Sequence, residues 1–339
     1  MNVEDERRWA YMRKGIVSMA LCLCAMRLAV AAGAEEGVRS LVKGLEREFA
    51  HVVEEMPEED SVGGIDIVPV VFYKESGELA LNYGEEDKKV AVADFSENLS
   101  VRNDSGLNID ISSYLDGGPD LSLSGEEPQI LIIHTHGSEA YTQWGADRYE
   151  ESDPYRTEDI SQNVIRVGDV LAQTLEKKGL TVIHDREIYD YPSYTGSYSR
   201  SGAATEKYLE KYPTISIVID LHRDALGSGD TVYKTKAEAS LGECAQLMLL
   251  VGTGQNGLYH PNWEENLKLA LYIQNAIEQS YPSLARPLAI KSERYNQHLS
   301  TGSLIIEVGS TGNTLAEAER AAQLFGEAAG DALALLIDE

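Results

Sequence analysis

The chain has 339 residues, of which 43% are hydrophobic and 25% are charged, so it is long enough for one large or two modest globular domains. Its formal net charge is -27, with 56 acidic against 29 basic residues. Nucleic-acid binding is excluded as a function, because phosphate recognition needs a basic face and the sequence has no run rich in Lys or Arg.

The first 35 residues have the pattern of an export signal or a membrane anchor. Arg13 and Lys14 precede an apolar run over residues 15–26, and small residues follow Arg27. The apolar run is short for a membrane span and Arg27 is costly at mid-bilayer, so both cleavage and retention as an anchor stay open. In either case we expect the remaining chain to be extracytoplasmic, either membrane-anchored or secreted.

Residues 36–128 are predicted to form a helical stalk and a small, poorly specified α+β region. Apolar residues at helical spacing predict an amphipathic helix over 37–58. Short apolar runs over 65–72 and 89–93, separated by clusters of Gly, Asn, Asp and Ser, predict a few loosely specified strands. The turn-rich stretch over 116–128 marks the expected boundary before a catalytic domain over residues 129–339.

Predicted strands and helices alternate over residues 129–339. Apolar runs predict strands at 129–133, 181–185, 215–221, 246–252 and 303–308, and helical spacing predicts helices at 163–178, 202–212, 263–281 and 315–337. Thr314 is the expected N-cap of the last helix, with Glu317 at the capping-box position. This order predicts an α/β fold of three layers, in which helices flank a mostly parallel sheet.

Two of the predicted strands end in side chains of the kinds that bind metal ions. His134, His136 and Glu139 follow the first strand, and His222 follows another. Ligands of open α/β sheets lie beyond the carboxyl ends of the strands. Imidazole and carboxylate are the ligands of catalytic zinc, and two His and one Glu leave a fourth position for water. We therefore predict that His136, Glu139 and His222 hold Zn²⁺.

Two further residues have predicted catalytic roles. Glu307 is a lone carboxylate in an apolar strand, where desolvation would raise its pKa toward that of a general base. Arg223 follows a predicted ligand and has two roles of equal weight: it stabilises an oxyanion or a substrate carboxylate, or it forms a salt bridge to Asp220 or Asp224.

Three motifs of this domain resemble the stage II sporulation protein P family of membrane-anchored cell-wall hydrolases. They are Ile-His-Thr-His-Gly-Ser-Glu-Ala-Tyr over 133–141, Asp-Leu-His-Arg-Asp-Ala over 220–225 and Ile-Glu-Val-Gly-Ser-Thr-Gly-Asn-Thr over 306–314. The domain is more distantly similar to zinc-dependent N-acetylmuramoyl-L-alanine amidases, whose Glu-x-Gly-x-x-x-Asn pattern matches the third motif. The His-x-x-Glu of the first motif is similar to the ligand pair of metallocarboxypeptidases.

The resemblance implies hydrolysis of peptidoglycan during engulfment of the forespore. The bond cleaved would be the amide between N-acetylmuramic acid and L-alanine, with additional endopeptidase activity on peptide cross-links. The implied partners are other sporulation cell-wall enzymes and membrane proteins.

The amidases usually take a glutamate ligand from the start of the next helix, but this chain has Asp-Ile-Ser-Gln-Asn over 159–163. We therefore assign that ligand to Glu139 and keep His134 in reserve.

Two alternative functions stay open. One is a zinc carboxypeptidase-like peptidase, in which Arg156, Arg200 or Arg223 would bind a terminal carboxylate. The other is a non-catalytic scaffold that binds the cell wall.

Overall fold

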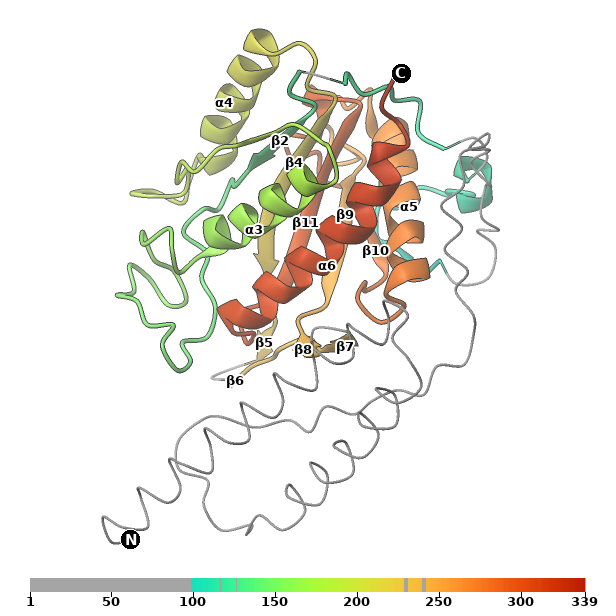
Figure 1. Ribbon diagram of the computed structural model, residues 1–339. Coiled ribbons are helices and arrows are strands. Elements are labelled where there is room, and N and C mark those ends of the chain that lie inside the picture. The colour runs from blue at the N-terminus through green and yellow to red at the C-terminus, as the bar shows by residue number, and fades with distance from the viewer. Residues whose placement is uncertain (1–98, 116–117, 126, 229–230, 240–241, 339) are drawn as a thin grey trace, which may run out of the picture. The chain divides into compact units, whose positions relative to one another are not determined.

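One seven-stranded sheet organises the part of the chain that the structure, a computed structural model, describes, namely residues 99–338 without 116–117, 126, 229–230 and 240–241 (Figure 1). In spatial order its strands are β1 (Val101–Asn103), β10 (Leu288–Lys291), β9 (Leu247–Gly252), β11 (Gly302–Ser310), β4 (Ile217–Asp224), β2 (Ile130–Ile133) and β3 (Val182–His184). The predicted export signal or anchor, the helix over 37–58 and the strands over 65–72 and 89–93 lie outside the described residues.

Neighbouring strands of this sheet are parallel except at one place. β9 and β11 run antiparallel, and all other adjacent pairs run parallel. The carboxyl ends of β11, β4, β2 and β3 therefore meet at one edge of the sheet. The predicted α/β fold with a mostly parallel sheet is confirmed.

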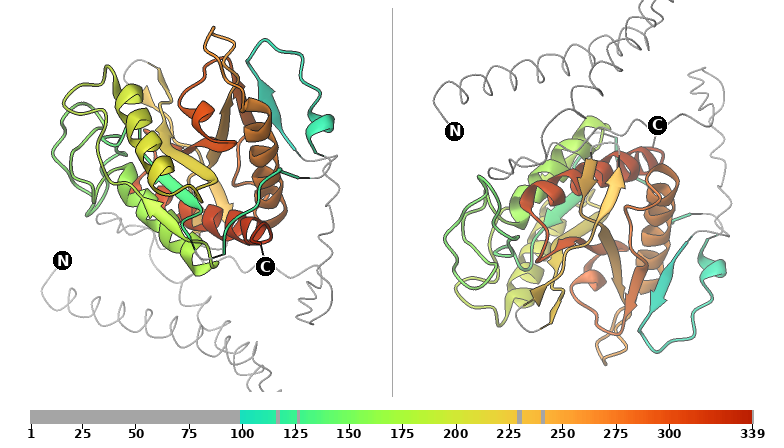
Figure 2. Two further views of the ribbon diagram at one scale, coloured as in Figure 1. Left: turned by 90° about the horizontal axis from the view of Figure 1, so that it is seen from above. Right: turned by 90° about the horizontal axis from the view of Figure 1, so that it is seen from below.

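Helices cover both faces of the sheet and complete the three predicted layers (Figure 2). Helices α3 (Val164–Lys177), α5 (Trp263–Ser280) and α6 (Leu315–Ala334) pack on one face, and α4 (Ser197–Lys211) packs on the other. Side chains alternate between the faces along each strand. In β2, Ile130 and Ile132 therefore join the large core under α3, α5 and α6, whereas Leu131 and Ile133 join the smaller core under α4.

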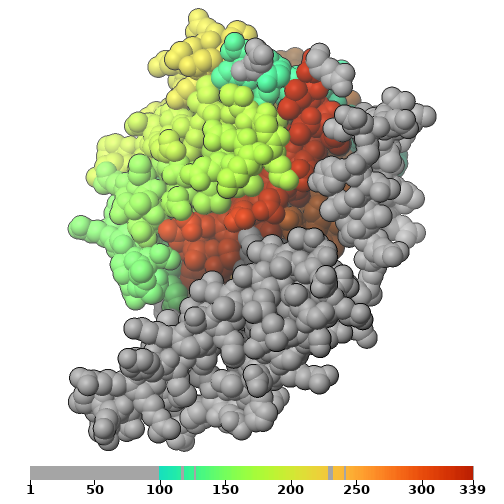
Figure 3. All heavy atoms as spheres, in the orientation of Figure 1, coloured from blue at the N-terminus to red at the C-terminus, as the bar shows by residue number. Residues whose placement is uncertain are grey.

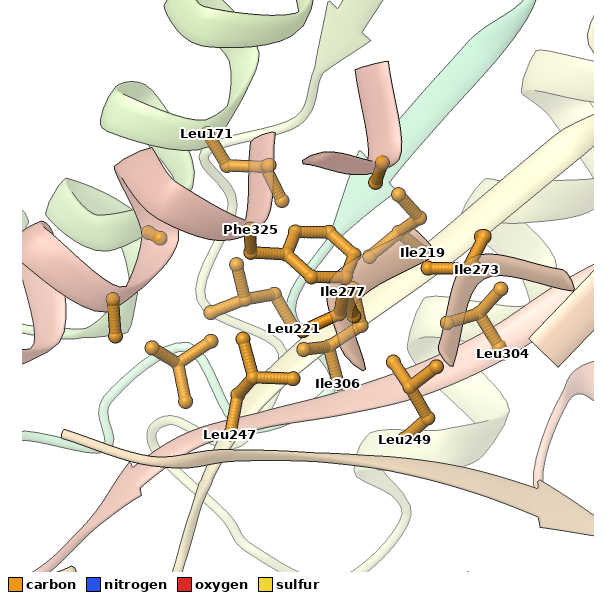
Figure 4. Packing of buried hydrophobic residues seen from close by; sticks show 14 of the residues in the cluster. Leu171, Ile219, Leu221, Leu247, Leu249, Ile273, Ile277, Leu304, Ile306 and Phe325 are labelled. Carbon is orange, nitrogen blue, oxygen red and sulfur yellow. The ribbon is translucent and has the colours of Figure 1, made fainter. Parts of the chain in front are cut away.

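The large core is closely packed around α6. Phe325 of α6 lies among Leu171 of α3 and Leu221 of β4 (Figure 4). α3 and α6 lie side by side (Figure 3), and Gly326 allows this approach, because a Cβ added there would come within 2.8 Å of the Thr174 Cβ. Close helix packing of this kind fixes α3 and α6 as a rigid support behind the sheet.

The four predicted helices of the domain are present, with two differences in length. Helix α6 ends at Ala334, three residues before the predicted end at Ile337. Helix α4 begins at Ser197, five residues before the predicted start at Gly202. Its first turn has a low intrinsic preference for the helix, so its sequence gives little signal. The capping box of α6 is confirmed, since the Thr314 side chain accepts from the Glu317 N–H at 3.2 Å and the Glu317 carboxylate accepts from the Thr314 N–H at 3.0 Å.

Several short elements were not predicted. They are strands β1 and β10, the 3₁₀ helices Ile111–Tyr114 and Gln297–Leu299, and two hairpins, β5 (Gly227–Ser228) with β6 (Thr231–Val232) and β7 (Ala237–Ala239) with β8 (Gly242–Cys244). β1 lies N-terminal to the expected boundary at 128, yet it pairs with β10 at the edge of the sheet. The sheet thus includes residues from both sides of that boundary. Within the described ranges, no helix has the length and apolar character needed to cross a membrane.

Candidate active site

β4 and β11 place His222 and Glu307 side by side on the α4 face of the sheet. The two residues are register partners in this parallel pair. Ile305, two residues before Glu307, belongs to a cluster on the α4 face, and Val218 of β4 packs on the same face. Because side chains alternate with a period of two, Glu307, His222 and Asp220 all point to this face.

The backbone turns sharply just after Glu307. The register of β11 shifts between Glu307 and Ser310, and Gly309 has a φ of 71°, which favours glycine. The Asn313 side chain accepts from the Ser310 N–H at 3.0 Å and donates to the Glu317 carboxylate at 2.9 Å. The Glu-x-Gly-x-x-x-Asn motif is therefore a turn that fixes the end of β11 and the start of α6 behind Glu307.

The loop after β2 brings His136 and Glu139 to the same place. The rings of His136 and His222 are nearly perpendicular, with centroids 5.2 Å apart, and Glu139 Oε2 lies 3.7 Å from His222 Nδ1. Glu139 is held from behind by the Arg156 side chain at 3.3 Å and by the backbone N–H of Arg223 at 3.1 Å. Three predicted ligands and the predicted base thus come from three separate strands to one cluster, which we call the His-Glu cluster.

Three atoms of this cluster have unused hydrogen-bonding capacity. His136 Nδ1, His222 Nε2 and Glu307 Oε2 are buried without hydrogen-bond partners, although His222 Nε2 lies 2.9 Å from the Asp220 carboxylate. As they stand, however, no three or more His, Cys, Asp or Glu side chains in the described part of the chain are arranged so that they could hold a metal ion.

Burial and neighbouring charges give the members of the His-Glu cluster different protonation equilibria. Burial raises the pKa of Glu307 to about 7, with a further contribution from the charge of Glu139 and opposition from His222. Burial, followed by the charge of His222, lowers the pKa of His136 to about 4. Burial also lowers the pKa of His222, but the carboxylates of Asp220, whose Oδ1 lies 2.9 Å from His222 Nε2, of Glu139 and of Glu307 together raise it, to about 10. The surrounding carboxylates thus favour positive charge at this point.

Arg223 is buried and directed away from both carboxylates considered for it. Its Nε donates to the Ala140 carbonyl at 2.9 Å and its Nη2 to the Tyr155 carbonyl at 3.1 Å. Within the described residues, neither Asp220 nor Asp224 forms a salt bridge with it, so that predicted role is wrong. Arg223 holds two loops together behind Glu139, and its action on an oxyanion stays a prediction.

His134, the reserve ligand, lies on the opposite face of the sheet. It is fully buried, with Nδ1 2.9 Å from the Leu221 carbonyl and Nε2 2.8 Å from His184 Nε2. A Cβ added to Gly168 of α3 would come within 2.8 Å of this ring, which shows how closely α3 covers it. The structure therefore does not bring His134 to the His-Glu cluster.

The segment before α4 adds two further residues, Asp190 and Tyr194, to the site. Asp190 accepts from the Ser138 N–H at 3.0 Å, pairs with Arg156, and lies 3.8 Å from His136 Nδ1. The Tyr194 ring stacks on the His136 ring at a centroid distance of 4.4 Å. No sequence pattern indicates these contacts, because they depend on how the loop folds back. Asp220 was detectable, since it precedes His222 by two residues on a strand.

Comparison with known proteins identifies the family. The stage II sporulation protein P family model matches residues 70–329. Stage II sporulation protein P of Bacillus subtilis (strain 168) is 29% identical over 215 residues, which cover 60% of this chain and 51% of the relative, so the match spans about half of that relative's length.

Among solved structures, an N-acetylmuramoyl-L-alanine amidase from Clostridium difficile 630 aligns with a TM-score of 0.37 and 15% identity, covering 62% of this chain and 96% of the amidase. The CwlD amidase from Clostridioides difficile, in complex with the GerS lipoprotein, aligns with a TM-score of 0.37 and 13% identity, covering 61% and 98%. The family assignment rests on the match of the family sequence model to residues 70–329, which is well over half of the chain. The chain belongs to the stage II sporulation protein P family.

Proposed function

We propose that this chain is a zinc-dependent peptidoglycan hydrolase that acts during forespore engulfment. It cleaves the amide between N-acetylmuramic acid and L-alanine, and it also cleaves peptide cross-links. The observation that carries the proposal is the position of Glu307, a buried carboxyl group with a pKa of about 7 beside its register partner His222 at the carboxyl edge of the sheet. Family membership supports the cell wall as the substrate.

The donor set of the His-Glu cluster fits zinc. His136, Glu139 and His222 supply two imidazoles and one carboxylate, and His136 Nδ1 is buried without a partner. Two donors bound to one tetrahedral zinc lie roughly 3.3 Å apart, close to the 3.7 Å between Glu139 Oε2 and His222 Nδ1. When bound, zinc would polarise the scissile carbonyl as a Lewis acid and lower the pKa of water.

Glu307 performs the proton transfers of this reaction. Its ionised carboxylate accepts a proton from the water that attacks the amide carbonyl carbon. It then returns the proton to the departing amino group of L-alanine, so that a carboxylic acid and an amine leave. A pKa of about 7 suits both steps at neutral pH, because the group exchanges protons in either direction without a large free-energy difference.

The contacts of the three arginines weaken the carboxypeptidase alternative. Arg156 is engaged by Glu139 and Asp190, Arg223 by two backbone carbonyls, and Arg200 by the carbonyls of the loop before α4. A residue that binds a terminal carboxylate needs free N–H groups directed at the substrate. The contacts that the three arginines already make therefore leave none of them well placed to bind a terminal carboxylate.

The proposed place of action is outside the cytoplasm, where the substrate is located. The predicted export signal or anchor over residues 1–35 supplies the route, and other cell-wall enzymes and membrane proteins of sporulation are the proposed partners.

Digestion of purified sacculi tests the proposal. The full chain should release stem peptides that carry a new N-terminal L-alanine, which mass spectrometry of the soluble products detects. Zinc should be present in the purified protein, and chelation should remove both metal and activity. Zinc near zero with activity unaffected by chelators would contradict the zinc mechanism. Trimming of C-terminal residues from a peptide library would favour the peptidase alternative, and wall binding without soluble products would favour the scaffold.

A further inference from the structure

A groove of about 470 Å³ lies on the α4 face of the sheet, next to the His-Glu cluster. One side of α4 and the loops that follow β9 and β10 form its walls. Tyr198 belongs to both the groove and the cluster, because its ring centroid lies 5.5 Å from that of His136 and 5.8 Å from that of Tyr295. A substrate bound at the cluster can therefore extend past Tyr198 into the groove.

The wall that Tyr295 and Asn296 form is fixed to α4. The Asn296 side chain donates to the Tyr198 carbonyl at 2.9 Å and to Ser201 Oγ at 3.0 Å. A Cβ added to Gly202 would come within 2.9 Å of Asn296 Oδ1, so the loop and the helix are in close contact. Tyr295 has a φ of 50°, an uncommon conformation for a bulky residue that the surrounding contacts must maintain. The groove is therefore preformed.

Basic side chains with unused nitrogen atoms gather at this wall. Both ring nitrogens of His260, which is 6% exposed, are buried without a hydrogen-bond partner, as are His298 Nδ1 and Arg294 Nε. The rings of His260 and His298 have centroids 6.5 Å apart, and burial together with the charges of His298 and Arg294 lowers the pKa of His260 to about 4. Buried N–H groups normally have an acceptor, so this cluster lacks a group that accepts hydrogen bonds.

Arg294 has no carboxylate partner within the described residues, although acidic residues exceed basic ones by 56 to 29 in the chain. The one hydrogen bond that it forms to a described residue is long, 3.4 Å from Nη1 to the Tyr259 carbonyl. Glu206 and Glu293 also line the groove, but neither pairs with Arg294 or His298. These two glutamates disfavour a polyanion, such as a phosphate polymer, and suit an ammonium group next to a single carboxylate.

We propose that this groove is a subsite that binds a free carboxylate of the substrate's peptide, with Arg294 and His298 as the residues that recognise it. Arginine presents a planar fork of donors that matches a carboxylate. The identification of that peptide as a peptidoglycan stem peptide rests on the proposed function. The geometry of the subsite does not.

Binding measurements on the catalytically impaired full chain Glu307→Gln test the subsite without turnover. The probes are an N-acetylmuramoyl-L-alanyl peptide with free carboxylates and the same compound with those groups converted to carboxamides. We expect the free carboxylates to bind about 10-fold more tightly, as for a charge-assisted hydrogen bond. Adding Arg294→Gln should abolish this difference, and Arg294→Lys should retain part of it.

The matched control is Arg102→Gln, which removes an exposed arginine of the edge strand β1 that does not line the groove and should leave the 10-fold preference unchanged. Melting temperatures identify a variant that fails to fold, in which case His298→Gln replaces it. Equal affinities for the two probes, or an equal loss of both on Arg294→Gln, would overturn the subsite. If the free carboxylates bind more tightly but the unmodified chain releases no stem peptides from sacculi, the subsite is upheld and the proposed function is rejected.

Discussion

His134 and His136 stand two residues apart in the sequence, yet they lie in opposite environments on the two faces of the sheet. His134 is enclosed under α3, with both ring nitrogens in hydrogen bonds of 2.9 and 2.8 Å. His136 lies on the α4 face beside His222 and Glu139, and its buried Nδ1 has no partner. Both residues are buried histidines, but only His134 has a hydrogen-bond partner for each ring nitrogen within the fold.

This difference shows which property separates a structural histidine from one available for chemistry. Burial, together with the charge of a neighbouring histidine, lowers the pKa of both imidazoles, to about 3 for His134 and about 4 for His136. What differs is the number of hydrogen-bond partners, since an imidazole whose two nitrogens are both hydrogen-bonded has no lone pair or N–H left for a ligand. The predictions below test the two sides of the sheet separately.

The largest expected effect is on the α4 face, where Glu307→Gln should lower turnover by about 10²- to 10⁴-fold, the usual contribution of a positioned proton-transfer group. Zinc content and melting temperature should be nearly unchanged, because Glu307 Oε2 has no hydrogen-bond partner to lose. In contrast, His222→Ala should lose metal and activity together. Sacculus hydrolysis, metal analysis and thermal unfolding of both variants give the comparison.

A folded, zinc-loaded Glu307→Gln protein with undiminished turnover would remove Glu307 from the mechanism. A loss of roughly 3–5 kcal/mol in stability would instead mark Glu307 as part of a buried ion pair.

The pH dependence of turnover should follow the same residue. Glu307 accepts a proton only when it is ionised, and burial raises its pKa to about 7. On the acid side of that value, kcat/KM should fall roughly tenfold per pH unit, as for a single ionisation. Initial rates on solubilised glycan fragments from pH 5 to 8 measure this profile. An acid limb that persists unchanged in the residual activity of Glu307→Gln would assign the ionisation to another group.

On the α3 face, His134→Ala should affect stability and leave the metal in place. The variant removes a fully buried ring and leaves the Leu221 carbonyl and His184 without their partners, so we expect a loss of about 2–4 kcal/mol in the free energy of unfolding. Denaturant unfolding measures this loss. Zinc content and turnover per folded molecule should match the unmodified chain, whereas loss of zinc without loss of stability would restore His134 as a ligand.

The sequence was sufficient to predict the class of fold and the edge of the sheet where the site lies. Apolar runs that end in His222 or lead to His136 identify buried strands, and parallel strands bring their carboxyl ends together. It was not sufficient to place Glu307 beside His222. That contact requires β11 to lie between β4 and β9 and antiparallel to β9, an order that depends on long-range pairing.

The same limit applies to the two histidines after β2. Strand alternation places His134 and His136 on one face if the strand continues, but β2 ends at Ile133 and a turn carries His136 to the other face. Asp190 and Tyr194 reach the site because Arg200 holds the carbonyls of their loop, a tertiary contact with no local sequence pattern.

The smallest expected effect concerns how the stability difference between the unmodified chain and His134→Ala changes with pH. His134 Nδ1 donates to a carbonyl, so in the neutral ring Nε2 carries no proton and faces His184 Nε2 at 2.8 Å. Burial, with the charge of His184, accordingly lowers the folded-state pKa of His134 to about 3, below its ordinary value of 6.5. Between these values the unfolded chain binds a proton that the folded chain does not, so acid favours unfolding of the unmodified chain.

The variant lacks this ionisation. The difference in the free energy of unfolding between the unmodified chain and His134→Ala should therefore shrink as the pH falls below about 6.5, by at most about 1.4 kcal/mol per pH unit. Parallel denaturant titrations at pH 7.5, 6.0 and 5.0 measure the gap, and Leu171→Ala is the matched control, since it removes a fully buried side chain of α3 that does not titrate. A gap that stays constant or widens with acid would mean that His134 is protonated in the folded protein. In that case His134 and His184 on the α3 face would form a charged pair. Zinc binding alone would then distinguish His136 from His134.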